Sequence, residues 1–474
     1  MSFDLILSGG RVVLPDGSVE ALDIAVTAGR IAALVQPGTP LDAAERIDAR
    51  GLHVLPGIID AHLHLGHGAD ISRPRVPEDA ASETGAAAAG GITTFIPYIL
   101  TPERYENGLF DEIRAVTEAG ARIDFGYHFI ISTEEQLAGV PRYAAEYGVA
   151  SFKIFMNNRG GEGARLGLPD IDDGFLFRLA EAAAGANALV CPHPENIEVS
   201  WVLRDRAKAR DPEGRGGLAA WDETRPGFIE ADAVQRAALL CQAAGATLYV
   251  VHTSSAPALE AAIVARRRGA NVLVETCPHY LTHDVTWEGG DRGKINPPLR
   301  HTADREALWA ALAAGAVDTV ATDHVHRTVA SKEGGIWAAS PGCPGLETLL
   351  PVMLSEGHAK RGLPLGRVVD VLSRNPAGIM GLAGKGAVAV GHDADFTLVD
   401  LGAEWVLDRS GVWSNARYSI YEGWRFKGKV LTTLVRGRPV FRDGELVGGS
   451  VGTGRYQARR REPVARRKLD AAAG

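Results

Sequence analysis

Six residues that can bind metal ions, directly or after modification, lie near the ends of five apolar segments far apart in the chain. They are His62 and His64 in IIDAHLHL, Lys153 in ASFKIFM, His193 in ALVCPHPEN, His252 in LYVVHTSS and Asp323 in VDTVATDHV. Residues that end different strands can meet only if the strands lie side by side and parallel, as in a β/α barrel with its active site at one face. The pattern predicts a metal-dependent barrel enzyme.

The His62 and His64 pair fits one metal ion. Side chains along a strand alternate between faces, so residues two apart point the same way. A lone pair of this kind is more often structural than metal-binding. Here the apolar flanks and the other strand-end candidates favour a metal site.

Lys153 lies inside the apolar run VASFKIFM. Burial without a partner drives a lysine toward its neutral amine, which can react with carbon dioxide to form a carbamate. A carbamate is an anion whose two oxygens can bridge two cations. The alternative is a lysine of an edge strand that extends its amine to solvent.

His193 and His252 would give two nitrogens to a second ion, and the Asp323 carboxylate can bind metal or move a proton. Two divalent cations, less three negative charges from the carbamate, Asp323 and hydroxide, leave a site of about +1 that would stabilise an oxyanion. Histidine and carboxylate ligands suit zinc, although manganese, cobalt and iron also fit. We therefore expect two divalent ions, most simply Zn²⁺.

Eight β-rich runs alternate with Ala-rich helical stretches between residues 54 and 384, a pattern typical of βα units. The runs cover residues 53–65, 92–100, 123–131, 149–156, 188–196, 247–255, 271–281 and 317–325. Eight such units favour a closed (β/α)8 TIM barrel over an open sheet. The strand-rich ends, 1–53 and 385–450, should form one discontinuous β-sandwich. Residues 451–474 form a basic tail, expected to be solvated or to contact another subunit.

The composition is that of a soluble globular protein. Of the 474 residues 46% are hydrophobic and 23% charged, and the formal net charge of -8 gives no basic footprint for nucleic acid. The sequence shows no run of about 18 apolar residues and no secretory signal pattern, so we expect no membrane span and a cytoplasmic location. The four cysteines are too scattered for a disulfide framework.

Longer motifs carry a resemblance to a known family. PGIIDAHLHL, ETCPHYL, KINPPLR, ATDH, PGLETLLP and NPAGIMGL, together with the FKIFM lysine, resemble the cyclic amidohydrolase branch of the amidohydrolase superfamily. That branch includes hydantoinases, dihydropyrimidinases, allantoinases and dihydroorotases. The resemblance implies one ion on His62, His64 and Asp323, a second on His193 and His252, and a carboxylated Lys153 between them. It also implies that Asp323 shuttles the proton, and that the chain forms a homodimer or homotetramer.

The same resemblance points to substrate contacts at Asn158, Asn296 and Gly345. Hydantoinases similar to this chain usually carry an oxyanion-binding Tyr five residues after the bridging lysine, where this sequence has Asn158. Asn296, before PPLR, would contact substrate through its backbone. Dihydroorotases resemble HxHxR, whereas Gly66 stands at the Arg position here, which argues against their charged substrate.

The expected reaction is hydrolytic opening of a hydantoin or 5,6-dihydropyrimidine ring to an N-carbamoyl amino acid. Allantoinase stays open as an alternative, because His279 in ETCPHYL stands as it does in allantoinases. An alternative of another class is a non-catalytic dihydropyrimidinase-like scaffold protein. That alternative predicts eroded ligands, and all six are present.

Overall fold

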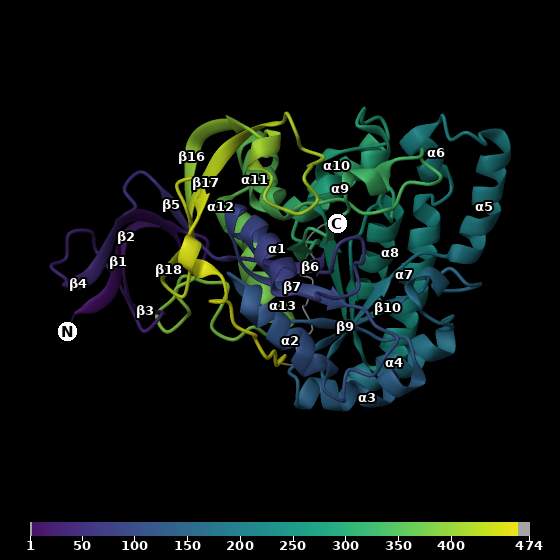
Figure 1. The fold of residues 1–474 in the computed structure, drawn as a ribbon, viewed down its shortest axis with the longest axis horizontal. Helices are drawn as coiled ribbons and strands as arrows, with labels where there is room; N and C mark the ends of the chain where they lie inside the picture. The colour runs from purple at the N-terminus through teal and green to yellow at the C-terminus, as the bar shows by residue number, and fades with distance from the viewer. Residues whose placement is uncertain (1, 463–474) are drawn as a thin grey trace.

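The computed structural model describes residues 2–462. A helical body surrounds a parallel sheet, and a β domain lies at one side of it (Figure 1). The first strands of the chain, purple in the picture, lie in this β domain together with the yellow strands from the other end of the chain. Both ends of the chain therefore build the smaller domain, while the middle builds the larger one.

The larger domain is a (β/α)8 barrel. Its sheet runs in the order β14-β13-β12-β11-β10-β9-β7-β6-β15, with β8 beside β7 and every pairing parallel. β14 and β15 are two parts of one segment, so their pairings with β13 and β6 close the ring. The strands are β6 (Ile58–His64), β7 (Ile92–Ile99), β8 (Asp124–Phe125), β9 (His128–Ile130), β10 (Ser151–Phe155), β11 (Leu189–His193), β12 (Thr247–Val250), β13 (Val272–Thr276), β14 (Thr319–Val320) and β15 (His324–Val325).

Burial on both faces explains the apolar barrel strands. Every residue of β6, β7, β11 and β13 is buried. A parallel sheet covered by helices on the outside and filled by side chains on the inside selects such continuous apolar runs. The sequence signal of eight apolar runs therefore reflects the real barrel, and that prediction is confirmed.

Helices cover the barrel and begin at recognisable caps. Thr133 and Asp172 accept backbone N–H bonds at the starts of α3 and α4, and α7 ends at Gly245 with φ of 75°. The helices are α1 (Pro77–Ala89), α2 (Leu109–Gly120), α3 (Glu134–Ala145), α4 (Asp173–Gly185), α5 (Ile197–Arg210), α6 (Gly217–Glu223), α7 (Gly227–Ala244), α8 (Ala256–Arg267), α9 (Pro278–Thr282), α10 (Thr302–Ala313), α11 (Leu349–Val352), α12 (Leu365–Val369) and α13 (Asn375–Met380). α5 and α6 form an insertion between β11 and α7.

The β domain is one nine-stranded sheet in the order β19-β18-β17-β16-β5-β1-β2-β3, with β4 beside β1. Antiparallel pairing of β5 with β16 joins the two ends of the chain. Apolar side chains from both ends meet in one core, so the sheet folds over itself. Its strands are β1 (Phe3–Val13), β2 (Val19–Thr27), β3 (Arg30–Val35), β4 (Ala43–Asp48), β5 (His53–Pro56), β16 (Phe396–Val406), β17 (Arg425–Val435), β18 (Arg438–Arg442) and β19 (Glu445–Leu446).

The first predicted barrel run, 53–65, divides in two. His53–Pro56 is β5 and pairs with β1 and β16 in the β domain, whereas the barrel strand begins at Ile58. Gly57 lies between them, where a Cβ atom would come within 2.0 Å of the Thr93 hydroxyl. The chain passes from one domain to the other at a point that only glycine can occupy.

The expected basic tail is described as far as Glu462, and part of it packs on the barrel, whereas Arg455 and Arg460 are exposed. Arg459 is 1% and Arg461 7% exposed. Their guanidinium groups donate to main-chain carbonyls, among them those of Met380 and Ile379. Tyr456 lies beside Phe125 through an isolated parallel bridge. These buried residues therefore pack on the barrel, and residues 463–474 lie outside the described residues.

Among the residues that the structure describes, no helix combines the length and apolar character needed to cross a membrane.

Candidate metal centre

The barrel brings the six candidate ligands to one end of its strands. His62 and His64 lie at the end of β6, Lys153 within β10, His193 at the end of β11, His252 just after β12, and Asp323 between β14 and β15. Asp323 Oδ1 lies 3.1 Å from His62 Nε2 and 3.7 Å from His64 Nε2. The ring centroid of His252 lies 5.3 Å from that of His62 and 4.7 Å from that of His193.

Two of these residues have unusual backbone conformations. His252 has φ of 39° and Asp323 has φ of 46°, in the left-handed region that residues other than glycine seldom adopt. Asp323 interrupts the eighth strand, and its N–H donates to the His62 carbonyl at 2.8 Å. Such strain persists where surrounding structure enforces it, commonly at functional sites. Both of these strained positions are therefore candidate metal ligands.

Lys153 is buried, with 1% of its surface exposed. Its Nζ lies 4.6 Å from the Tyr98 ring centroid and 5.7 Å from that of Phe155. Burial lowers the pKa of Lys153 below its ordinary value, although the carboxylates of Asp323 and Glu275 oppose the shift. The amine therefore stands in the environment that favours its neutral form.

His64 and His252 favour their neutral, metal-binding form, whereas the pKa of His62 is raised, because the carboxylates of Glu275 and Asp323 outweigh the effect of burial. Burial lowers the pKa of His64 to about 3, and burial together with Lys153 and His193 holds the pKa of His252 well below its ordinary value. Burial opposes ionisation of Asp323, but the charge and the hydrogen bond of His62 outweigh it and hold its pKa well below the usual range.

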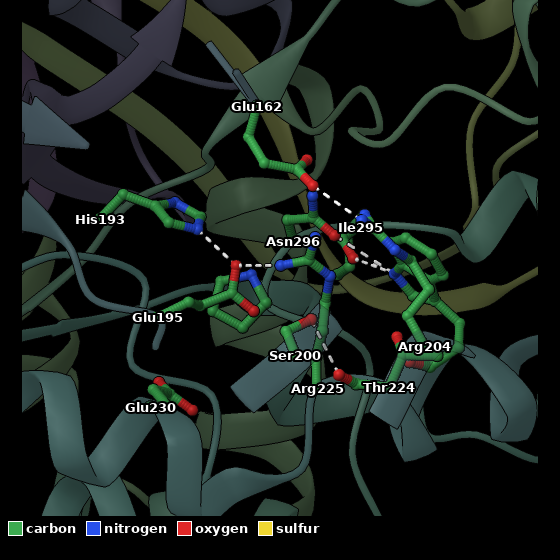
Figure 2. A network of polar contacts seen from close by, with 12 residues as sticks. Glu162, His193, Glu195, Ser200, Arg204, Thr224, Arg225, Glu230, Ile295 and Asn296 are labelled. Carbon is green, nitrogen blue, oxygen red and sulfur yellow. Dashed lines mark hydrogen bonds and ion pairs between the residues drawn. The ribbon is translucent and has the colours of Figure 1, made fainter. Parts of the chain in front are cut away.

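Two buried glutamates orient the histidines, and sequence reasoning missed both. Glu275 Oε1 lies 2.6 Å from His62 Nδ1 and also accepts the backbone N–H of His252 at 2.8 Å. Glu195 Oε2 lies 2.6 Å from His193 Nε2, as Figure 2 shows. Carboxylates at this position commonly fix the orientation of a metal-binding histidine. The available signal was an acidic residue inside or directly after an apolar strand, in VLVET and CPHPE.

The donor set fits divalent metal ions. Ligand atoms of His62, His64 and Asp323 all lie within 4.8 Å of one another. Both ring nitrogens of His252 are buried with no hydrogen-bond partner among the described residues, which is costly for a polar group unless something else binds it. Imidazole and carboxylate groups are ligands of zinc and related metals. His62 and His193 each offer one nitrogen to a carboxylate and keep the other for an ion.

The three predicted substrate contacts lie in loops at this end of the barrel. Gly345 donates its N–H to His324 Nδ1 at 3.1 Å and lies close to Thr322, next to Asp323. Asn158 follows β10, and its buried side-chain nitrogen has no hydrogen-bond partner among the described residues. Asn296 Oδ1 accepts a hydrogen bond from Trp221 Nε1 at 3.2 Å. Gly345 and Asn158 therefore lie next to segments that carry a candidate ligand, Asp323 and Lys153 respectively.

The family model described as "Amidohydrolase family" matches residues 53–440. The chain belongs to the amidohydrolase family. That span contains all six candidate ligands and extends into the β domain, so the resemblance inferred from the motifs is confirmed.

Similar amidohydrolases cover nearly the whole chain. An allantoinase of Deinococcus radiodurans is 38% identical, over 94% of this chain and 97% of its own. An L-hydantoinase of Paenarthrobacter aurescens is 33% identical, over 97% of this chain and 98% of its own. A solved D-hydantoinase aligns with a TM-score of 0.87 and 30% identity, over 97% of this chain and 99% of its own. The barrel with its added β domain is therefore the architecture of these enzymes, and the chain is a cyclic amidohydrolase.

Proposed function

We propose that the chain opens a hydantoin or 5,6-dihydropyrimidine ring by hydrolysis, releasing an N-carbamoyl amino acid. The observation that carries this proposal is the convergence of four histidines and Asp323 around the buried Lys153, with Glu195 and Glu275 orienting the rings of His193 and His62. Relatives named hydantoinase, and solved structures with the same title, support the choice of ring.

His62, His64 and Asp323 would hold one divalent ion, most simply Zn²⁺, and His193 and His252 a second. Lys153, carboxylated on its amine, would bridge them. When bound, the two ions would lower the pKa of water and polarise the ring carbonyl. Burial lowers the pKa of the Lys153 amine, which supports carboxylation, because only the neutral amine reacts with carbon dioxide.

Asp323 would carry the proton. Its side chain is 13% exposed and reaches the same space as His62 and His64, so a water and a ring amide can approach it. The carboxylate is ionised, since its pKa is held below the usual range, and its place beside the two histidines would let it accept a proton from the attacking water. It would then return that proton to the leaving ring nitrogen.

Allantoin is the second candidate substrate. Allantoin is a hydantoin ring with a ureido substituent, so the same ring opening applies to it. Three curated relatives at 36% to 38% identity are named allantoinase, which specifically favours this substituent. A non-catalytic scaffold is not favoured, because every ligand residue is present and placed.

A substrate panel tests the proposal. Zinc-loaded protein is assayed with hydantoin, a 5-substituted hydantoin, dihydrouracil, allantoin and dihydroorotate, with the Asp323→Asn variant as matched control. Ring opening of at least one neutral substrate, lost after chelation and restored by zinc, is expected. Failure to open any of the five rings with both ions bound would contradict the proposal.

We also propose a homodimer or homotetramer. Two large apolar side chains of α7, Phe228 and Leu239, are 54% and 68% exposed, and a contact between copies would cover them. Light scattering that gives the mass of one chain at micromolar concentration would contradict this.

A further inference from the structure

The insertion formed by α5 and α6 contacts loops that belong to the site. In α5, Trp201 Nε1 and Arg204 Nη2 each donate to Glu162 Oε1 at 2.8 Å. Glu162 lies in the loop after β10 that also carries Asn158. Figure 2 shows this contact on one side and the His193 contact on the other, with Arg225 between them. The insertion is therefore placed to connect separate parts of the site.

Arg225, just after α6, reaches a metal-ligand histidine through one carboxylate. Its Nη1 lies 2.8 Å from Glu195 Oε2, the same oxygen that lies 2.6 Å from His193 Nε2. Arg225 is 4% exposed and Glu195 is fully buried. An ion pair excluded from water fixes both partners strongly, because removing one leaves the other buried without its counter-charge.

The same guanidinium also contacts the tryptophan that holds the Asn296 segment. The Arg225 guanidinium carbon lies 5.1 Å from the Trp221 ring centroid. Trp221 Nε1 donates to the Ile295 carbonyl at 3.0 Å and to Asn296 Oδ1 at 3.2 Å. Arg225 thus contacts two groups that face different parts of the site.

We propose that Arg225 is a positioning residue that ties the metal ligand His193 to the substrate-binding segment around Asn296. The inference rests on the proposed function, in which His193 holds an ion and Asn296 meets the ring. Through Glu195, Arg225 fixes the ring of His193 so that Nδ1 stays available to metal. Through Trp221, it fixes the backbone of residues 295 and 296.

The fold does not depend on Arg225 alone. Arg300 joins the insertion to the rest of the site independently, with its guanidinium 2.7 Å from Asp222 Oδ1 and 3.1 Å from Glu230 Oε2. Its Nε also donates to Ser254 Oγ at 2.9 Å. α6 and the segment before Arg300 therefore stay joined when residue 225 is changed.

Three variants separate the contact of Arg225 with Glu195 from its contact with Trp221. Arg225→Met removes both, and should weaken binding of one zinc ion per chain by 10- to 100-fold and raise KM by about tenfold. Arg225→Lys keeps a charge for Glu195 but not the planar group over Trp221, so it should restore most zinc binding without restoring KM. Trp221→Phe should raise KM and leave zinc binding unchanged. The matched control is Arg210→Met, which removes an exposed arginine of the same insertion and should change neither.

Zinc affinity is measured by titrating metal-free protein with zinc alone, KM by steady-state assay, and folding by thermal denaturation. Arg225→Met with parental zinc affinity and KM, even with a lowered Tm, would overturn the proposal, because a purely structural role moves only Tm. A parental KM in Trp221→Phe would overturn the part of the proposal in which Arg225 acts on the Asn296 segment through Trp221. The zinc titration needs no substrate. A wild-type protein that opens no ring would therefore refute the proposed function, while the zinc affinities of the Arg225 variants would still test whether Arg225 positions His193.

Discussion

At the scale of single residues, the site depends on Lys153, whose buried amine must be able to form a negatively charged carbamate. Its amine lies among Tyr98, Phe155 and the ligand histidines, with no room for bulk water. An uncharged amine there can take up carbon dioxide, and the resulting carbamate would supply the negative charge that two close cations need.

Lys153→Ala should therefore lose the bridging anion, and with it most of the bound metal and at least about 99% of kcat, on the scale of losing a metal-site function. Adding a short carboxylic acid should restore part of both, because its two oxygens can occupy the place of the carbamate. Metal analysis and steady-state rates check this. Lys360→Ala, at a lysine whose side chain is 59% exposed, is the control, and parental activity in the Lys153 variant would refute the bridge.

Asp323→Asn should separate catalysis from metal binding. The amide keeps an oxygen that can face the ion but cannot accept a proton, so kcat should fall by about 10² to 10⁴ while most metal is retained. Rates and metal content are measured on the same preparation. Equal kcat in variant and parent would exclude the proton-shuttle role.

At the scale of elements, the sequence predicted that the ligand-bearing strand ends converge, but not which residues hold the ligands in place. Apolar runs ending in His193, His252 or Asp323 follow from burial on both faces of a parallel sheet. Glu195 and Glu275 could not be recognised from the sequence. A carboxylate that orients a ligand histidine is recognisable only once distant strands lie side by side. The division at Gly57 was missed for the same reason, since β5 is defined by its pairing with β16.

The loop after β6 bears on substrate charge. Arg73 is buried and pairs with Glu112 at 2.8 Å, and Arg75 lies 3.4 Å from Asp70. Both arginines are thus already paired with carboxylates, and Gly66 supplies no cation, so a buried substrate carboxylate would find no counter-charge in this loop.

We therefore expect neutral rings to be preferred over dihydroorotate by at least about tenfold in kcat/KM, equivalent to about 1.4 kcal/mol. Steady-state assays of both substrate types on one preparation measure the ratio. A higher kcat/KM for dihydroorotate would show that one of these arginines leaves its carboxylate to bind substrate.

At the scale of the whole molecule, one buried cation joins barrel to β domain. Lys385 Nζ lies 2.9 Å from Asp124 Oδ2 in the barrel and 2.6 Å from Asp395 Oδ2 next to β16. Asp393 Oδ2 lies 3.1 Å away, and the lysine side chain is 1% exposed. Burial opposes the charge on Lys385, but the three carboxylates outweigh it and raise its pKa above the ordinary value.

Lys385→Met should lower the free energy of unfolding by about 3–5 kcal/mol, because buried carboxylates would repel one another without their shared partner. Thermal and denaturant unfolding measure the loss. Arg142→Met, which removes an exposed pair with Glu146, should change stability by less than about 1 kcal/mol. An unfolding free energy of Lys385→Met equal to the parent's would mean that the junction does not depend on this cation.

The ratio of metal to protein tests the central claim most directly. Protein prepared with added zinc and bicarbonate, freed of loosely bound metal and analysed for its elements, should hold about two ions per chain, because five other ligand residues converge around Lys153. One ion or none under these conditions would contradict a two-metal site bridged by a carboxylated Lys153.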